Sequence, residues 1–151
     1  MRLEWLILAD AAQNVGGKLF LLGGGWETLM VNTVPVQQQM ALAIAFDVTW
    51  NETNERHPFQ ILIQDQDGAE LAKVEGEFEV GRPPGIPPGQ SQRFQMAAPA
   101  TLSFQAYGTY VIKVLLRGEE VGSIRFHVVQ NPLFAITQQR KEGPPKDEGK
   151  P

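Results

Sequence analysis

The two histidines are the side chains best suited to metal binding or proton transfer, and neither has the neighbours that such chemistry needs. His57 precedes Pro58 at the start of an apolar run, and His127 lies inside an alternating run. A metal site on one element needs a second ligand at a spacing such as H-x-H or H-x-x-E, and neither spacing is present. The chain has no cysteine, which excludes thiolate ligands and disulfides. The sequence therefore predicts no metal site.

Two further patterns look like ligand sites and fail on detail. The run from Asp65 to Gly68 is like the start of a calcium loop, but aligning its glycine puts Ile63 and Val74 at ligating positions. A hairpin turn is the better interpretation. The glycines at 23–25 have neither a dinucleotide-binding spacing nor a following Gly-Lys-Ser/Thr. We expect a structural bend there, and no cofactor.

Nucleophilic catalysis has no signature in this chain. The serines at 91, 103 and 123 lie outside the G-x-S-x-G pattern of a nucleophile elbow. Carboxylates that are distant in the sequence can still meet in a fold. We therefore expect no catalytic residue, and a hydrolase with dispersed catalytic residues is the third of three functional hypotheses.

The composition indicates one acidic, glycine-rich and proline-rich domain. The chain has 151 residues, a net charge of −4, 15 glycines and 11 prolines. This charge argues against binding to nucleic acid or to an anionic membrane surface. The first residues do not form a signal peptide, and no apolar run approaches a membrane span. We expect a cytoplasmic protein.

The elements that must position any site are clearest between residues 107 and 129, where two alternating runs flank a glycine-centred turn. Their inward side chains are Tyr110, Ile112, Val114, Leu116, Ile124, Phe126 and Val128. Ile112 and Ile124 must face the same core, and a two-residue loop alone would not pair them. The pattern therefore predicts a hairpin with a longer loop, or with a β-bulge near Gly118 or Gly122.

The outer face of this hairpin mixes apolar and basic side chains. Its members are Val111, Lys113, Leu115, Val121, Arg125, His127 and Val129. Such a face is either a solvated sheet with scattered valines or a partner surface, and both interpretations stay open. Trp26 and Tyr107 are the aromatic residues expected to be exposed, where they could stack on a sugar.

The predicted fold is an all-β, immunoglobulin-like antiparallel β-sandwich of seven to nine strands. Residues 40–50 show the cleanest alternation, with large apolar side chains on one face and alanines on the other. Gly108-Thr109-Tyr110 resembles the last hairpin of immunoglobulin-like sandwiches, where a tyrosine sits at a corner. We expect one domain over residues 1–136 and a disordered tail over 137–151, because residues 138–151 have no apolar side chain.

The first thirty residues resemble a known family. The pattern LADAA at residues 8–12, GKL at 17–19 and LGGGW at 22–26 is similar to that of a bacterial domain-of-unknown-function family. The resemblance implies a bacterial origin and carries no activity and no catalytic residue.

The first two predicted strands, residues 3–9 and 18–22, are apolar on both faces. One sandwich core covers one face of each sheet, so Leu6, Leu8 and either Phe20 or Leu21 should be left over. A homodimer would bury them, unless residues 133–136 or the proline-rich loop, residues 82–92, folds back over them. We expect a non-catalytic protein-binding or structural module that self-associates. The alternative is a sugar-type ligand-binding sandwich whose ligand is unknown.

Overall fold

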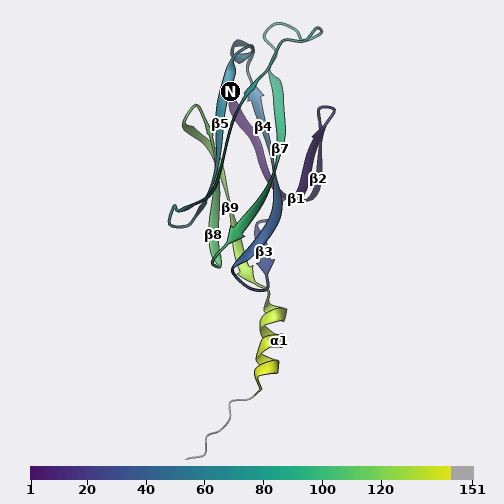
Figure 1. Ribbon diagram of the computed structural model, residues 1–151. Coiled ribbons are helices and arrows are strands. Elements are labelled where there is room, and N and C mark those ends of the chain that lie inside the picture. The colour runs from purple at the N-terminus through teal and green to yellow at the C-terminus, as the bar shows by residue number, and fades with distance from the viewer. Residues whose placement is uncertain (144–151) are drawn as a thin grey trace, which may run out of the picture.

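The computed structural model describes residues 1–143, which form nine strands, a short 3₁₀ helix between the fourth and fifth strands, and one C-terminal α-helix (Figure 1). The elements are β1 (Arg2–Val15), β2 (Lys18–Gly24), β3 (Thr28–Val31), β4 (Val36–Val48), η1 (Trp50–Glu52), β5 (Arg56–Asp65), β6 (Glu70–Glu79), β7 (Gln92–Phe104), β8 (Gly108–Leu116), β9 (Glu119–Gln130) and α1 (Pro132–Glu142).

The strands form two sheets that pack face to face as an all-β sandwich. One sheet has the order β2-β1-β4-β7 and the other has the order β3-β9-β8-β5-β6. The pairs are antiparallel, as predicted, except for the short edge strand β3, which pairs with β9 in parallel. Among residues 1–143 the strands number nine, which agrees with the predicted seven to nine.

Alternation along β4 fills the core, as the sequence predicts. Its inward side chains, from Met40 to Val48, are buried against the inward residues of β5, β8 and β9. Phe46, Phe104 and Phe126 are the largest fully buried side chains. The core is therefore built from large apolar groups of both sheets.

The final hairpin has the predicted register and reaches it through a bulge. Ile112 pairs with Ile124 across β8 and β9. The turn is a two-residue loop at Arg117 and Gly118, both with positive φ, and the register then shifts so that Val114 pairs with Gly122. Val121 is the extra residue, so the predicted bulge near Gly122 is confirmed.

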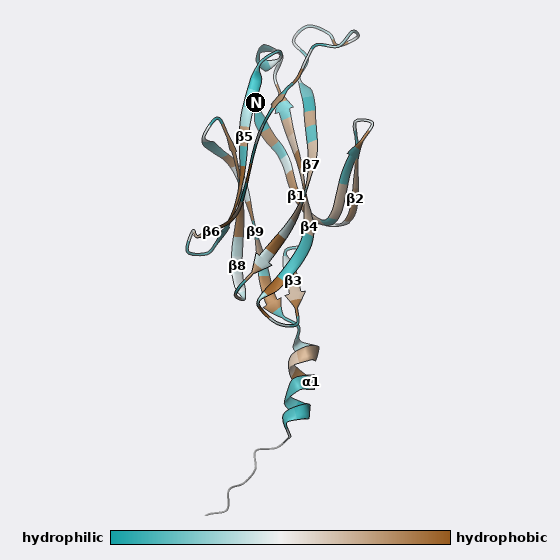
Figure 2. Cartoon of the chain, in the orientation of Figure 1, coloured by the Kyte–Doolittle hydropathy of each residue, from teal (hydrophilic) through white to brown (hydrophobic). Residues whose placement is uncertain are grey.

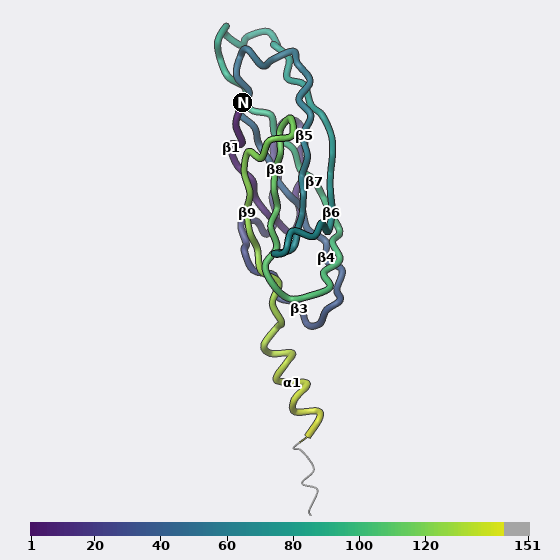
Figure 3. Tube along the Cα trace, turned by 90° about the vertical axis from the view of Figure 1, so that its left-hand side faces the viewer, coloured from purple at the N-terminus to yellow at the C-terminus, as the bar shows by residue number. Residues whose placement is uncertain are grey.

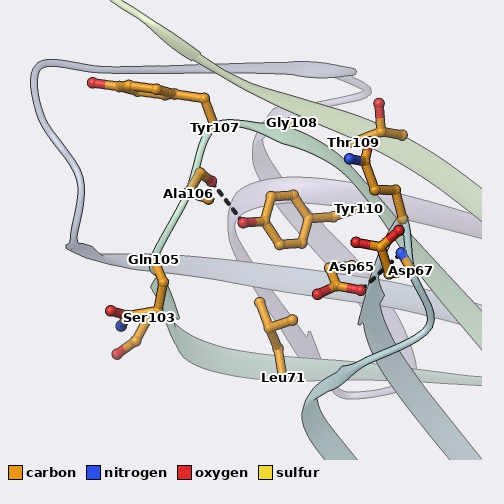
Figure 4. A pocket seen from close by; sticks show the side chains of 11 residues that line it. Asp65, Asp67, Leu71, Ser103, Gln105, Ala106, Tyr107, Gly108, Thr109 and Tyr110 are labelled. Atoms are coloured by element: carbon orange, nitrogen blue, oxygen red, sulfur yellow. Dashed lines mark hydrogen bonds between the residues drawn. The ribbon is translucent and has the colours of Figure 1, made fainter.

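A tyrosine corner ties the start of β8 to the connection before it. The Tyr110 hydroxyl donates a hydrogen bond of 2.7 Å to the backbone carbonyl of Ala106 (Figure 4). Burial raises the pKa of this phenol. The arrangement agrees with the immunoglobulin-like resemblance of Gly108-Thr109-Tyr110.

Replacing Tyr110 with phenylalanine should cost about 1–2 kcal/mol of the free energy of unfolding, because the Ala106 carbonyl loses its donor while packing is kept. Urea denaturation followed by circular dichroism measures the change. A midpoint equal to that of the wild type would show that the hydroxyl contributes nothing to stability.

The second half of β1 leaves the sandwich and forms a two-stranded arm with β2. Residues Arg2 to Ala9 pair with β4, whereas Ala9 to Val15 pair with β2. The arm, residues 10–24, stands beside β4 and β7 as a separate ribbon in Figure 1. Its turn is formed by Gly16 and Gly17, both with positive φ.

The arm folds back over the alanine face of β4. Although β1 and β7 are not neighbours in the sheet, Asn14 donates a hydrogen bond of 2.7 Å to the carbonyl of Gln95 in β7. The Gln95 side chain returns one of 2.7 Å to the carbonyl of Gly17. Ala43 and Ala45 are fully buried even though they point away from the core. Thus the cover over this face comes from the arm, not from residues 133–136 or the proline-rich loop.

The glycines at 23–25 form the predicted bend at the end of the arm. Gly23 and Gly25 have positive φ, a conformation that favours glycine. A side chain on Gly23 would collide with the Asp10 carboxylate, whose nearest oxygen lies only 2.3 Å from the position of a β-carbon. Glycine is therefore needed for conformation and for close approach, as the sequence suggests.

The C-terminal segment continues past residue 136 as a helix. Residues 137–142 belong to α1 and are not an irregular tail, while residues 144–151 lie outside the described part of the chain. Asn131 caps the helix by accepting the backbone N–H of Leu133, and Pro132 occupies its first turn. Helix-forming Gln, Arg, Lys and Glu residues then continue it without any apolar face.

The helix α1 projects away from the sandwich. It continues from the end of β9 in both Figure 1 and Figure 3, and none of its residues is buried. Figure 2 shows more apolar residues at its start and hydrophilic residues toward its end. It therefore does not cover the apolar surfaces of the sandwich. Among residues 1–143, no helix combines the length and hydropathy needed to cross a membrane.

Candidate functional site

The outer face of β8 and β9 brings most of the predicted site residues together. Val111 pairs with Arg125, and Thr109 pairs with His127. Val111, Lys113 and Leu115 are half-buried on this face, while Arg125 and His127 are exposed. Val121 is the exception, because the bulge turns it inward to pack on the core.

Polar contacts on this face are local and largely solvated. Lys113 forms an ion pair with Glu120 at 3.9 Å, and the Thr109 hydroxyl lies 3.0 Å from Nδ1 of His127. Within residues 1–143, Arg125 has no ion-pair partner. An exposed guanidinium beside half-buried valine and leucine is compatible with a partner surface and equally with a solvated sheet.

Tyr107 lies at the end of this face, beside a shallow hollow. The hollow has a volume of about 470 Å³ and includes Thr109, His127 and Val129 in its lining. Tyr107 is 39% exposed, and its hydroxyl donates to the carbonyl of Asn32 at 3.4 Å. The expected exposure of Tyr107 is therefore observed.

Trp26 is not an exposed platform. It is half-buried on the core, with its ring edge-to-face against Phe126 at 5.9 Å between centroids. Its indole N–H is buried without a hydrogen-bond partner among the described residues. The expectation that Trp26 stacks on a ligand is therefore wrong, because the glycine bend returns the chain toward the core. Trp50, expected in the core, instead lies in η1 with the Arg82 guanidinium 4.1 Å above its ring.

A small polar pocket lies on the other side of the β7–β8 connection (Figure 4). Its volume is about 190 Å³, and its polar lining includes Asp67, Ser103 and Gln105. Asp65 also lines it, but its carboxylate accepts the backbone N–H groups of Asp67 and Ala69 at 2.9 Å each. The predicted turn is thus confirmed. The Asp65 carboxylate stabilises this turn through its two hydrogen bonds.

The other histidine belongs to a structural network. His57 is fully buried, with Nε2 2.7 Å from the carbonyl of Glu52 and Nδ1 3.1 Å from the Arg117 guanidinium. Nε2 must donate to the carbonyl and Nδ1 must accept from arginine, so the imidazole is neutral in this geometry. No group of three metal-binding side chains gathers anywhere in residues 1–143.

Glu52 has the strongest electrostatic perturbation in this network. Burial alone would raise the pKa of its carboxyl, but hydrogen bonds from the N-terminal ammonium and from Thr49 outweigh burial and lower it to about 2. The ammonium lies 2.7 Å from the carboxylate. This contact joins the start of β1 to η1, at the end of the sandwich away from α1.

Three strongly exposed apolar side chains lie on the arm, and a fourth, Met30, which is 63% exposed, lies on β3. Val15 and Phe20 are each 57% exposed, and Leu22 is 71% exposed. The sequence predicts Leu6 and Leu8 at a dimer interface. In the structure Leu8 is buried in the core, and Leu6 packs against the core. A register shift between Leu3 and Trp5 sets which face of β1 points inward. The apolar side chains that the first two strands leave exposed therefore lie on the arm.

The free edge of β2 is less protected than the other sheet edges. Charged residues on an edge strand oppose pairing with another strand, and β6 carries four glutamates and a lysine. The edge strand β7 contains Pro99, and β3 has only four residues. In β2, Lys18 is the sole charged residue. The sequence indicated the exposed apolar surface of β2 through the predicted strand at residues 18–22, which is apolar on both faces.

The architecture defines an immunoglobulin-like β-sandwich with a tyrosine corner and an added two-stranded arm. The chain belongs to a family of unknown function, DUF6941, whose family model matches residues 4–129. This match includes the arm and the final hairpin, so the predicted family resemblance is confirmed. No curated protein matches the chain.

Some solved structures are distantly similar. The Pseudomonas fluorescens alkylpurine DNA glycosylase AlkC, bound to DNA containing an abasic site analog, has 12% identity and a TM-score of 0.41, covering 68% of this chain and 27% of that chain. A beta-glucuronidase from glycoside hydrolase family 2 has 16% identity and a TM-score of 0.38, covering 62% of this chain and 10% of that one. A glycosyl hydrolase family 2 member from Bacteroides cellulosilyticus DSM 14838 has 12% identity and a TM-score of 0.37, covering 64% and 13%. The chain spans at most 27% of these proteins, and the likeness carries no functional argument.

Proposed function

We propose that this chain is a non-catalytic interaction module that binds a polypeptide, including its own copies, through the β1–β2 arm. The observation that carries the proposal is the exposure of Val15, Phe20 and Leu22 beside the unprotected edge of β2. An exposed apolar edge strand is a template for pairing with another strand. The outer face of β8 and β9, with Arg125 and His127, is a second contact region.

A photo-cross-linking amino acid placed at position 20 in the native cell tests this proposal. Matched variants carry the same group at Arg125, on the outer face of β9, and at Leu133, on α1. A discrete adduct from position 20, with its polypeptide partner identified by mass spectrometry, is the expected result. No adduct from any of the three positions would overturn the proposal. An adduct from Arg125 alone would overturn the assignment to the arm.

A small polar ligand, such as a sugar, is the second candidate. The observation that favours it is the pocket of about 190 Å³ beside Tyr107, with hydroxyl, amide and carboxylate groups in its lining. Its volume suits one sugar ring, and Tyr107 could contribute an aromatic face. Calorimetric titration with a panel of monosaccharides tests it. Binding that Tyr107→Ala weakens would support this role, and no heat with any monosaccharide would exclude it.

A further inference from the structure

We infer that two copies of this chain pair through their β2 strands, antiparallel about a two-fold axis at Leu21. The four-stranded sheets of the two copies then form one continuous sheet. This inference rests on the proposed function and names its partner as a second copy.

The arm presents free backbone groups in the right positions. Gly16 and Gly17 both have positive φ and form a two-residue turn, which makes Val15 and Lys18 its closing hydrogen-bonded pair. Bonded and non-bonded pairs alternate along an antiparallel ladder. The N–H and C=O groups of Leu19 and Leu21 therefore point away from β1, toward the free edge of the sheet.

Pairing about Leu21 matches the side chains of the two copies. Phe20 lies opposite Leu22 of the second copy, and the symmetric contact repeats this pair. These two side chains, 57% and 71% exposed, share the outer face of the arm because they pair with Gln13 and Ala11 of β1. Cross-strand aromatic–aliphatic pairs stabilise a sheet. A single symmetric contact thus brings the largest exposed side chains of β2 into cross-strand contact with each other.

The charges favour the same pairing. Lys18 falls opposite Gly24 of the second copy, so the two lysines lie at opposite ends of the interface. With a rise of about 3.4 Å per residue, they are roughly 20 Å apart along the strands. By contrast, self-pairing of β6 would bring together strands that each carry Glu70, Glu75, Glu77 and Glu79. Of the other sheet edges described here, β3 has no charged residue but only four residues, and β7 contains Pro99. The edge of β2 is therefore a longer, proline-free edge that meets its own copy without opposed charges.

The arm also lacks a neighbouring strand at its free edge. Its inner side is held by Asn14 and Gln95 over the alanine face of β4. A two-stranded ribbon alone is only marginally stable in water, and its outer face keeps Phe20 and Leu22 in solvent. Pairing of two arms gives four adjacent strands. The open edge of β2 in each copy is then paired with the β2 strand of the other copy.

Size-exclusion chromatography with light scattering, at high micromolar concentration, tests the inference. The wild-type chain should have twice its 16.7 kDa mass. Leu22→Lys should have the monomer mass, because it places a charge opposite Phe20. Leu133→Lys is the matched control, since Leu133 is 74% exposed but lies on α1, and it should remain a dimer. Circular dichroism confirms that each variant keeps its strands.

A second variant tests the backbone pairing. Leu21→Pro removes an N–H that faces the free edge and leaves the ladder to β1 intact, so it should also give monomers. A wild-type monomer at this concentration, or a dimer that survives Leu22→Lys and Leu21→Pro, overturns the inference. If the wild type is a monomer and position 20 still cross-links to a different polypeptide, the proposed function stands without the dimer. If neither occurs, both fail.

Discussion

Replacing Phe126 with alanine will lower the free energy of unfolding by about 3–5 kcal/mol, the usual cost of removing a buried phenylalanine ring. Phe126 is fully buried on β9. Its ring lies 5.6 Å from that of Tyr110 and 5.9 Å from those of Trp26 and Phe104, measured between centroids. The truncation leaves a cavity that four elements share, so the site cannot collapse without moving both sheets.

Chemical denaturation of the purified variant measures this loss. Phe126→Leu is the matched control and should cost less than half as much, because most of the volume is kept. A loss below about 1 kcal/mol for Phe126→Ala would contradict its assigned burial and the register of the final hairpin.

Replacing Ala43 with phenylalanine will cost about 1–3 kcal/mol and will release the arm from the sheet. Ala43 is fully buried between Ile7 and Ala97 on its neighbouring strands, under the β1–β2 arm. A ring has no space there, so the arm must move away and the contacts of Asn14 with Gln95 must break. Hydrogen exchange in residues 10–24 should accelerate while the core strands stay protected.

The control for this variant is Ser123→Phe. Ser123 is exposed on the outer face of β9, and a ring there should change stability little. If Ala43→Phe is as stable as the wild type and the arm keeps its protection, the arm does not cover the alanine face.

The sequence was most informative where one face of a strand is apolar and the other is polar. Such contrast defines a register, because a shift by one residue exposes the whole apolar set. Ile112 opposite Ile124, the bulge beside Gly122 and the alternation of β4 were all predictable for this reason. The tyrosine corner was also predictable, from the local pattern around Tyr110.

The first strand was harder, because it is apolar on both faces and has no such contrast. The bulge between Leu3 and Trp5 decides that Leu6 and Leu8 point inward, and no local signal marks it. That the arm covers the alanine face depends on Asn14 reaching Gln95, a contact between residues 81 positions apart. Loops and strands give no sequence signal for such distant packing.

The candidate site was predictable only in part. The outer face of β8 and β9 follows from alternation, and the structure places Lys113, Arg125 and His127 there. The position of the Trp26 ring was not predictable from the sequence. Three preceding glycines allow many chain directions, and packing of the ring on Phe126 selects one of them. The helix α1 could not be predicted from apolar periodicity, because its residues have none. It is stabilised by its N-cap and by the helix propensity of its residues.

Hydrogen exchange of the β2 backbone at low and high micromolar concentration tests the central claim most directly. The N–H groups of Leu19 and Leu21 point to a free edge within one chain, so only a second strand can protect them. Exchange in residues 18–24 should slow as the concentration rises, while exchange in α1 stays constant. Exchange in residues 18–24 that is fast and equal at both concentrations would contradict the pairing of β2 with a second copy.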